Sequence, residues 1–269
     1  MAAVTADAAL FEPDGDDRFV PTGFSAGPWS QGFLHGAAVG ALLAGRLEEP
    51  DQVVARVLVE MMAPVPSGPL RVDLGPREGG RRVVRQAATL LADEKPVARA
   101  FALRMRLGEV DLPEQATRQP GTFTEDEVPD LSEPNRRAAK AVGWDSFDSL
   151  AIATRWEQRP PEEVGRHRMW LRLLVPVLPG GPPSAIENVV ACADFARGGT
   201  SRRLDMRSWS FMNADLVVSL SRPPAGDWFG LDTDAYLSAT GTGQSVATIH
   251  DEAGVLGETT QSLLIEDRG

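Results

Sequence analysis

Apolar positions in the first third of the chain predict one helix followed by strands. Phe33–Glu49, "FLHGAAVGALLAGRLEE", combines Leu and Val with Gly and Ala residues that permit close backbone packing. Glycine weakens an isolated helix, so we expect this one to be buried against a sheet. Val53–Val65 has the composition of a strand, and Pro69–Leu107 predicts three strands joined by the turn-like stretches "GPREGG" and "ADEKP".

The pattern of apolar positions is lost after Leu107 and returns in the second half. Residues 108–144 are rich in Pro, Glu, Asp and Thr and lack periodicity, which predicts a linker. The stretches "FDSLAIATRWEQ" and "HRMWLRLLVPV" then predict strands, and Asn188–Gly199 predicts a second helix. Strand-like sequence continues from there to the C-terminus.

The two halves repeat each other in the order of their elements. Matched positions lie 159, 159 and 158 residues apart, and the pairs are Pro64 with Pro223, Asp73 with Asp232, and Asp93 with Asp251. On the last offset, Gln261 in the final strand corresponds to Leu103 in the first half. A unit of one helix, one long strand and a three-stranded meander is therefore predicted twice.

This duplication predicts an α+β fold with two antiparallel curled sheets, each wrapped around a central helix. The two sheets can pair edge to edge, which would cover their exposed edges. The predicted organisation is an N-terminal unit at 1–107, a linker at 108–144 and a C-terminal unit at 145–269.

The second predicted helix contains an unexpected carboxylate. In "NVVACADFARGG" the apolar residues fall at helical spacing, yet Asp194 lies within the run. Either Asp194 faces solvent or ends the helix before Gly198, or it carries out chemistry. The pattern alone favours the first alternative.

Composition and charge narrow the classes of partner. The chain has 269 residues, is 42% hydrophobic and carries a net charge of -11, which argues against nucleic acid or an anionic membrane as the main partner. The single cysteine, Cys192, excludes an intramolecular disulfide and a Cys-rich metal site, and we expect it to be a buried, inert thiol.

Targeting and metal-binding patterns are missing from the sequence. No run of about 18 apolar residues predicts a membrane-spanning helix. The acidic N-terminus lacks the features of a signal peptide, so we expect a cytoplasmic protein. No His, Cys, Asp or Glu spacing is typical of a metal site, and no cofactor is expected.

Three stretches, in this order, resemble the type II acyl-CoA thioesterases, the TesB-like double hotdog proteins. "HRMWLRLLVPVLPGGPPSAIENVVACADFARGG" is similar to the family's strand, Pro turn and second hotdog helix. "NADLVVSLSRPPAGDW" is similar to a strand that ends in an Arg-Pro pair, and "DEAGVLGETTQSLLIE" to a closing hairpin with a glutamine. The resemblance covers nearly the whole chain and implies a double hotdog fold.

The resemblance also implies a set of residues that orient a hydrolytic water. The family's helix aspartate matches Asp194 and its last-strand glutamine matches Gln261. Its hydroxyl residue, two positions before the strand residue Asp215, matches Asn213, where the family has Thr or Ser. An amide can also donate and accept hydrogen bonds, so Asn213 either positions the water or weakens the site.

Each of these residues also has a structural alternative. Gln261 lies in an alternating strand, where pattern alone favours a solvent-facing side chain, and Asn213 could be a turn residue at the start of a strand. Backbone N–H groups at a helix N-terminus suit the developing oxyanion, which points to His35 and Gly36 at the start of the first helix. His35 could instead only pack there.

The resulting expectation is hydrolysis of acyl-CoA thioesters by water held by Asp194, Asn213 and Gln261, without a cofactor. The alternative is a non-catalytic protein that binds acyl-CoA or acyl chains. A hotdog hydratase ranks last, because the helix with Asp194 has no histidine. Neither nucleic acid binding nor membrane insertion is expected. Of a monomer and a homodimer of double hotdogs, we favour the homodimer.

Overall fold

The computed structural model describes residues 8–113, 143–156, 166–201 and 203–269, which form one large antiparallel sheet with a few helices. The strands of the first half are β1 Phe11–Pro13, β2 Arg18–Pro21, β3 Gln52–Met61, β4 Leu70–Leu74, β5 Glu78–Gly79, β6 Val83–Ala92 and β7 Lys95–Arg106. Those of the second half are β8 Ile152–Trp156, β9 His167–Leu173, β10 Trp209–Asn213, β11 Asp215–Leu220, β12 Phe229–Leu237, β13 Thr242–Asp251 and β14 Gly254–Asp267. The helices are η1 Gly23–Ser25, α1 Gly36–Arg46, α4 Phe147–Leu150, α5 Ala185–Ala193, η3 Asp194–Arg197 and α6 Gly198–Ser201.

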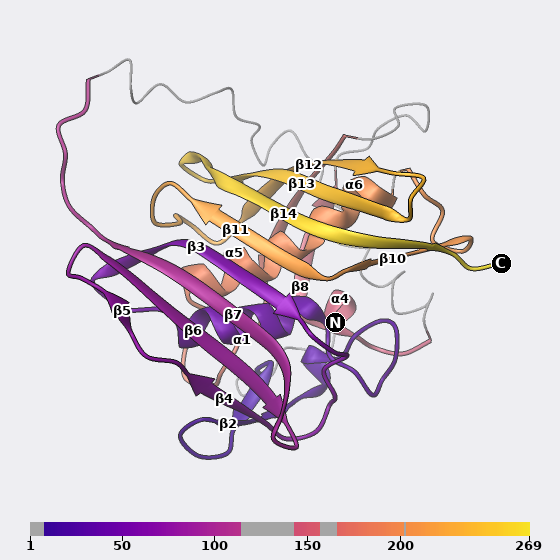
Figure 1. Ribbon diagram of the computed structural model, residues 1–269, viewed down its shortest axis with the longest axis horizontal. Coiled ribbons are helices and arrows are strands. Elements are labelled where there is room, and N and C mark those ends of the chain that lie inside the picture. The colour runs from indigo at the N-terminus through magenta and orange to yellow at the C-terminus, as the bar shows by residue number, and fades with distance from the viewer. Residues whose placement is uncertain (1–7, 114–142, 157–165, 202) are drawn as a thin grey trace.

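The sheet is continuous across the two halves of the chain (Figure 1). Its strand order is β1-β2-β4-β6-β7-β3-β11-β14-β13-β12-β9-β8, and β5 and β10 pair beside this path. The halves meet where β3 pairs with β11 edge to edge, with Leu58 opposite Val217. The sequence predicted this edge pairing but two separate sheets, whereas the pairing merges the strands into one sheet of 14.

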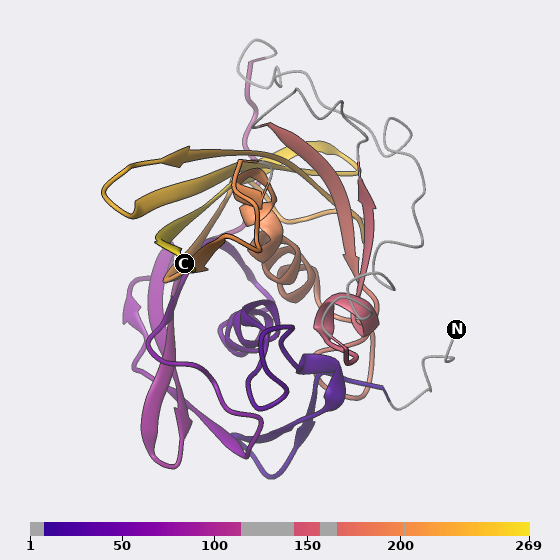
Figure 2. The ribbon, with the colours of Figure 1, turned by 90° about the vertical axis from the view of Figure 1, so that its right-hand side faces the viewer.

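Helices α1 and α5 lie side by side in the concavity of the sheet (Figure 2). Both are buried along nearly their whole length, as the Gly- and Ala-rich pattern of the first helix predicted. A Cβ added at Gly40 would lie 3.2 Å from Val190 Cγ1, so the absence of a side chain there allows the close approach of the helices. The core of the molecule is therefore the layer between these two helices and the inner face of the sheet.

The second helix differs from its prediction at both ends. It begins at Ala185 rather than Asn188, because Ser184 and Glu187 form a capping box that satisfies the first backbone N–H groups. It ends at Ala193, and the predicted continuation to Gly199 is a 3-10 turn, η3, followed by the short α6. The change of helix type begins at Asp194.

Most predicted strands of the first half are present with shifted ends. The strand predicted at Val53–Val65 is β3 and stops at Met61, and the stretch Pro69–Leu107 contains β4, β6 and β7 with the short β5 in between. The hairpin of β1 and β2 was not predicted. The predicted linker, 108–144, lies largely outside the described residues, since 114–142 are not described. None of the described helices is long and apolar enough to cross a membrane.

Strand pairing corrects the alignment of the two halves. The hairpin of β6 and β7 is closed by the pair Ala92 and Lys95, and that of β13 and β14 by Asp251 and Gly254, so the offset is 159 residues in both strands. The sequence comparison used 158 here and matched Gln261 with Leu103. With the observed offset, the counterpart of Gln261 is Ala102.

Candidate active site

Asp194 lies at the junction between α5 and η3 and is 4% exposed. It therefore ends α5, as one alternative from the sequence had it, but it does not face solvent. The chain can turn tightly after it because Gly198 packs against Met169, and Gly199 packs against the backbone of Asp234. This turn keeps the carboxylate inside the molecule, close to the seam between the two halves.

Two amide side chains hold the Asp194 carboxylate. Asn213 Nδ2 donates to Asp194 Oδ1 at 3.0 Å. Gln261 Nε2 lies 3.1 Å from the same oxygen and 3.0 Å from the Asp194 carbonyl oxygen. Because a carboxylate only accepts hydrogen bonds, both amides must turn their NH₂ groups toward Asp194. Gln261 is fully buried, and its Oε1 has no hydrogen-bond partner among the described residues.

A bulge directs Asn213 inward. Asn213 pairs with Leu263 and Val217 pairs with Thr260, so the register of β14 against β10 and β11 shifts by one residue around Ala214. The three residues that the family resemblance matched, Asp194, Asn213 and Gln261, thus come together from η3, β10 and β14.

The start of α1 completes this cluster from the first half of the chain. His35 is the N-cap of α1, and its Nδ1 lies 3.4 Å from Asp194 Oδ2. A Cβ added at Gly36 would lie 3.3 Å from Asp194 Oδ2 and 3.5 Å from Met61 Cε, so a glycine leaves room beside the carboxylate. The structure therefore brings all five sequence-predicted site residues together.

Asp148 belongs to the cluster but was not predicted from the sequence. Its Oδ2 lies 3.6 Å from His35 Nε2, on the opposite side of the ring from Asp194. Burial would raise the pKa of the Asp148 carboxyl, but His35 and Arg197 outweigh burial and hold that pKa below its ordinary value. The sequence signals a helix start here, through the capping box of Ser146 and Ser149, but nothing local links it to His35.

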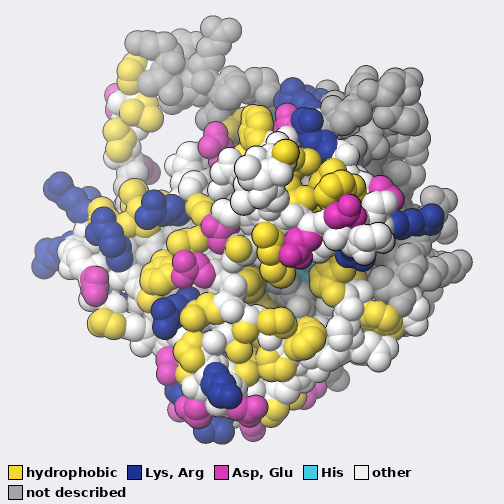
Figure 3. Space-filling model, turned by 45° about the vertical axis from the view of Figure 1, so that its right-hand side comes forward, with side chains coloured by type: hydrophobic (Ala, Val, Ile, Leu, Met, Phe, Trp, Pro, Cys, Tyr) yellow, Lys and Arg dark blue, Asp and Glu magenta, His cyan; other side chains and the backbone are white. Residues whose placement is uncertain are grey.

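A cavity of about 520 Å³ opens beside these residues. Most of its lining is apolar, and the polar members include Asn213, Arg197 and Arg268; the apolar members include Trp29, Phe33, Val39, Met61, Met206 and Phe211. Figure 3 views the molecule from the side of β10 and the C-terminus and shows apolar side chains over much of this face. The cavity can take an apolar group next to Gly36 and Asn213 and an anionic group near the two arginines.

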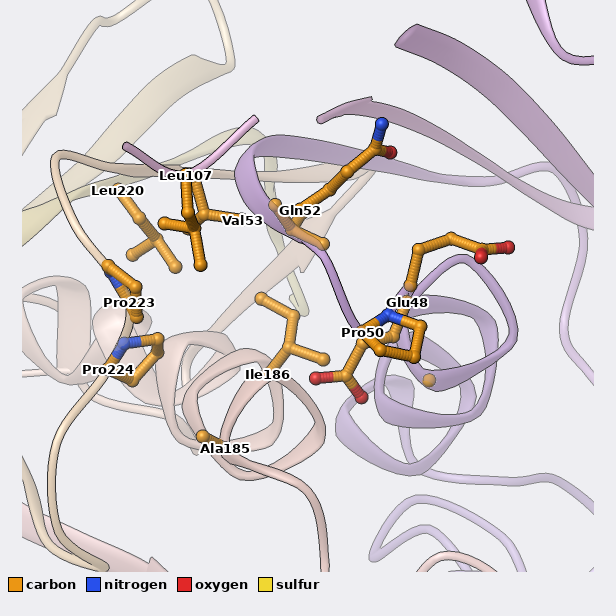
Figure 4. Close-up of a pocket in the computed structure, with 13 residues that line it drawn as sticks. Glu48, Pro50, Gln52, Val53, Leu107, Ala185, Ile186, Leu220, Pro223 and Pro224 are labelled. Carbon is orange, nitrogen blue, oxygen red and sulfur yellow. The ribbon is translucent and has the colours of Figure 1, made fainter. Parts of the chain in front are cut away.

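A second cavity, of about 430 Å³, occupies the position that the internal repeat relates to the first (Figure 4). Three residues that line the first cavity each lie 159 positions from a residue that lines the second: Asn213 is matched by Val54, Met61 by Leu220, and Pro64 by Pro223. In Figure 4, Ile186 lies between the two prolines Pro223 and Pro224 on one side and Glu48 and Pro50 on the other.

The chemistry of the first cavity is missing from its counterpart. Val54 replaces the amide of Asn213, and Ala102 replaces that of Gln261. Glu48 and Glu49 line the second cavity and give it acidic groups instead. The carboxylate with its two amides is thus present at one of the two related positions.

Cys192 takes no part in this chemistry. It is fully buried on α5, where its Sγ donates to Asn188 Oδ1 at 3.4 Å. Burial raises the pKa of the Cys192 thiol, which disfavours the reactive thiolate. The expected buried thiol is confirmed. Among the residues that the structure describes, no group of three His, Cys, Asp or Glu side chains could hold a metal ion.

Two family models match the chain. One is described as the acyl-CoA thioesterase N-terminal domain and matches residues 25–105. The other is described as the acyl-CoA thioesterase C-terminal domain and matches residues 124–265, more than half of the chain. The second match includes Asp194, Asn213 and Gln261, and the first includes His35 and Gly36. No curated protein sequence matches the chain.

Solved structures share the fold over nearly the full length. A hotdog-fold protein of unknown function from Alicyclobacillus acidocaldarius has a TM-score of 0.72 at 14% identity, covering 99% of both chains. The tesB protein of Mycobacterium avium subsp. paratuberculosis has a TM-score of 0.67 at 17% identity, covering 95% of both chains. An acyl-CoA thioesterase II of Mycobacterium marinum has a TM-score of 0.65 at 13% identity, covering 100% of this chain and 98% of the other. At these identities the likeness establishes the hotdog fold.

Proposed function

The chain belongs to the acyl-CoA thioesterase family, and on that premise we propose that it hydrolyses acyl-CoA thioesters with a water molecule activated by Asp194. The observation that carries the proposal is the buried Asp194 carboxylate with two amides on one oxygen, Oδ1. These bonds leave Oδ2 free of the two amides and directed toward Gly36 and the start of α1. A carboxylate in this setting can accept a proton from water.

Gln261 and Asn213 both act on the Asp194 carboxylate, and Gln261 can also bind the water. Both stabilise the Asp194 carboxylate by donation to Oδ1. The remaining oxygen of Gln261, Oε1, is a buried acceptor that can receive the second hydrogen of a water held by Asp194. A Thr or Ser hydroxyl at position 213 would also donate one hydrogen bond to Oδ1, so the Asn213 amide supplies the same donor.

The N-terminus of α1 supplies the donor for the oxyanion in this proposal. The backbone N–H groups of Ala37, Ala38 and Val39 bond to His35. The Gly36 N–H comes first in the helix and has no intrahelical acceptor by geometry. We assign it to the carbonyl oxygen of the thioester, which becomes negatively charged as the water attacks.

Each half of the chain acts as one hotdog unit in this proposal, with units at 1–107 and 145–269. The C-terminal unit supplies Asp194, Asn213 and Gln261, and the N-terminal unit supplies His35 and Gly36. The substrate is an acyl-CoA, and no cofactor takes part in the reaction. The homodimer of such chains stays a prediction.

The test is hydrolysis of acyl-CoAs of graded chain length, followed by the release of free thiol. We expect turnover by the wild type and a loss of at least about 100-fold in kcat in Asp194→Asn, because the base is removed. Asp215→Asn, which removes a carboxylate outside the site, is the matched control. Circular dichroism establishes that both variants fold. Full activity in Asp194→Asn would contradict the assignment of the base.

The alternative function is binding of acyl-CoA without turnover, and Asn213 in place of the family's hydroxyl is the feature that favours it. The same experiment separates the two functions. Binding of acyl-CoA by the wild type, with no release of thiol at any chain length, would support the binding protein and exclude the hydrolase.

A further inference from the structure

Strand β7 directs its larger apolar side chains away from the helices. Three of its buried positions are the alanines Ala98, Ala100 and Ala102. The outward positions that alternate with them are Phe101, Leu103 and Met105. The solvent-facing side of an antiparallel sheet is usually polar, because it meets water. Phe101 is 42% exposed and Met105 is 40% exposed, so β7 presents an apolar surface on the outside of the sheet.

This apolar surface continues across the junction between the two halves. Phe101 of β7 is paired with Leu58 of β3, and Leu58 is paired with Val217 of β11. The offset of 159 matches Leu58 with Val217, so the row crosses the pseudo-twofold axis that relates the halves. In Figure 1 the helices α1 and α5 lie behind these strands. The central row, which is apolar apart from Thr260, consists of Ala87, Phe101, Leu58, Val217, Thr260 and Val246.

The charges that flank the central row differ in sign between the two halves. On the N-terminal half, Arg56, Arg85 and Arg99 point outward. On the C-terminal half, Asp215 and Glu258 point outward. The offset of 159 matches Arg56 with Asp215 and Arg99 with Glu258. The repeat therefore conserves these two charged positions in place and reverses the sign of the charge.

Most of these charges are not neutralised within the chain. The three arginines and Glu258 form no ion pair with any residue that the structure describes, and Asp215 accepts a hydrogen bond from the Ser262 N–H. Glu60, an acidic residue on the N-terminal half, lies directly opposite Arg99 and offsets part of its charge. The outer face thus has an apolar centre, a basic half and an acidic half.

We propose that this outer face of β6, β7, β3, β11 and β14 packs against the same face of a second copy of the chain. The N-terminal half of each copy lies against the C-terminal half of the other. A twofold axis parallel to the strands gives this arrangement, because it turns the face over and exchanges its halves. Two sheets packed in this way keep their strands within about 30° of each other.

The exchange of halves brings opposite charges together. A twofold axis parallel to the strands leaves the height of a residue along its strand unchanged, so each cross-strand row meets the same row of the partner. Arg56, Ser219 and Glu258 belong to one row. Arg56 therefore lies near Glu258 of the partner subunit, and this contact occurs twice in the dimer. The central row meets its own copy at the same time, which buries Phe101 and Leu58.

A second copy fits this face better than a lipid surface or an unrelated protein. An interface between identical chains must be self-complementary, and the reversal of sign between the halves provides that complementarity. An anionic membrane would be repelled by the acidic half. Association through this face is independent of the proposed hydrolysis, since Asp194 and Gln261 are buried on the inner side of the sheet.

The first test measures the mass of the protein by sedimentation equilibrium over a wide range of concentrations. We expect the wild type to approach twice the chain mass of 28.9 kDa. Phe101→Ser should raise the Kd of the dimer at least about 30-fold, because the ring lies near the centre of the interface in both copies. Leu74→Ser removes a side chain of similar exposure, 43%, on β4 outside the central row and should leave Kd unchanged.

The second test exchanges charges between two chains. Arg56→Glu and Glu258→Arg each oppose like charges at both contacts of their own dimer, so each should raise Kd about tenfold or more. In an equimolar mixture of the two variants, every such contact in the mixed dimer joins opposite charges. We expect the mixture to dimerise with a Kd within about threefold of the wild type. Arg18→Glu, at an exposed position on β2, is the control.

Each other result counts against the assigned face. A wild type that stays at the mass of one chain overturns it, and so does a dimer whose Kd is unaffected by both Phe101→Ser and Arg56→Glu. A mixture that dimerises no better than its two components excludes the exchange of halves. A monomeric wild type that binds phosphatidylglycerol vesicles, with the binding lost in Phe101→Ser, would assign the face to a lipid surface instead. Failure of the wild type to hydrolyse acyl-CoA would leave all of these measurements unchanged.

Discussion

At the scale of single residues, Asp194 is buried, and its two carboxylate oxygens have different neighbours. One carboxylate oxygen receives both amide donors, and the other faces Gly36 and His35. An isolated buried carboxylate would be costly in free energy, and the donors offset part of that cost while Oδ2 remains available. The division leaves Oδ2 beside Gly36, one of the residues that line the cavity.

The role of Asn213 can be separated from that of a hydroxyl by two substitutions. Asn213→Thr keeps one hydrogen-bond donor for Asp194, so we expect kcat within about threefold of the wild type. Asn213→Val removes the donor and introduces the residue type found at the related position, Val54. A hydrogen bond to a charged group contributes about 1.5–3 kcal/mol, so Asn213→Val should lower kcat about 10- to 100-fold. The measurement is steady-state hydrolysis of one acyl-CoA, and equal rates for Val and Thr would contradict the role.

The substitution Gly36→Ala should affect catalysis without lowering the stability of the fold. The new Cβ would lie 3.3 Å from Asp194 Oδ2, where the neighbours must move by a few tenths of an ångström, so we expect kcat to fall about tenfold. Alanine is the better helix former, and the free energy of unfolding should stay equal or rise by about 0.5 kcal/mol. Gly68→Ala, where an added Cβ would meet no atom within 4 Å, is the control. Lower stability with unchanged kcat would contradict the expectation.

At the scale of elements, the sequence predicted the existence of helices and long strands better than their ends. The first helix was recognisable because its apolar run is long, but the start of α5 depends on the capping box of Ser184 and Glu187, which the periodicity of apolar residues does not reveal. The alignment of Gln261 failed by one residue for a similar reason. Both hairpins contain Asp-Glu, but strand pairing closes them at different places relative to it.

The contact between Asp148 and His35 marks the limit of reasoning from one sequence. The two residues are far apart in the chain, and the short α4 that carries Asp148 shows only the signal of a helix start. Their proximity results from the docking of α4 beside the start of α1, where Phe147 stacks on His35. Asp194, Asn213 and Gln261 could be predicted only through resemblance, because pattern alone favoured surface roles.

Asp251 provides a test of how the second half is held together. At the end of β13 it accepts two bonds of 2.6 Å from Arg222 and one each from the Ala225 and Ala253 amides. Because Asp251 is buried and Arg222 remains partly exposed, we expect Asp251→Asn to lower the free energy of unfolding by about 2–3 kcal/mol at pH 7. Urea unfolding measures this, with Asp51→Asn, at an exposed position, as the control.

The same carboxyl gives a pH dependence with a defined sign. Burial would raise the pKa of Asp251, but Arg222 and the two amides outweigh it, so the pKa lies below its ordinary value. Its stabilising effect is therefore fully present above the unfolded-state pKa of about 3.9 and is lost as the pH falls through the lower folded pKa. The difference in stability between wild type and Asp251→Asn should shrink below about pH 4. A difference that grows on acidification would contradict this assignment.

At the scale of the whole molecule, the fold contains two cavities related by the internal repeat, and the candidate site lies beside one of them. The β3–β11 junction and the paired helices α1 and α5 place a cavity at each end of the helix pair. One end has a carboxylate, two amides and a glycine at a helix start, and the other has Val54 and Ala102 in place of the amides. The N-terminal half therefore contributes to the candidate site as well, because the start of its helix α1 faces Asp194 of the C-terminal half.

One acyl-CoA should consequently bind per chain. Coenzyme A is an anion. Arg197 and Arg268 line the first cavity, the one beside Asn213, whereas Glu48 and Glu49 line the second cavity. Calorimetric titration of Asp194→Asn, which binds without turnover, should give a stoichiometry near one. Arg197→Gln should weaken binding about tenfold, in line with loss of one partly exposed charge contact to phosphate, and Glu48→Gln should leave it unchanged. A stoichiometry of two, reduced to one by substitutions in the acidic cavity, would show instead that both halves kept the ability to bind substrate.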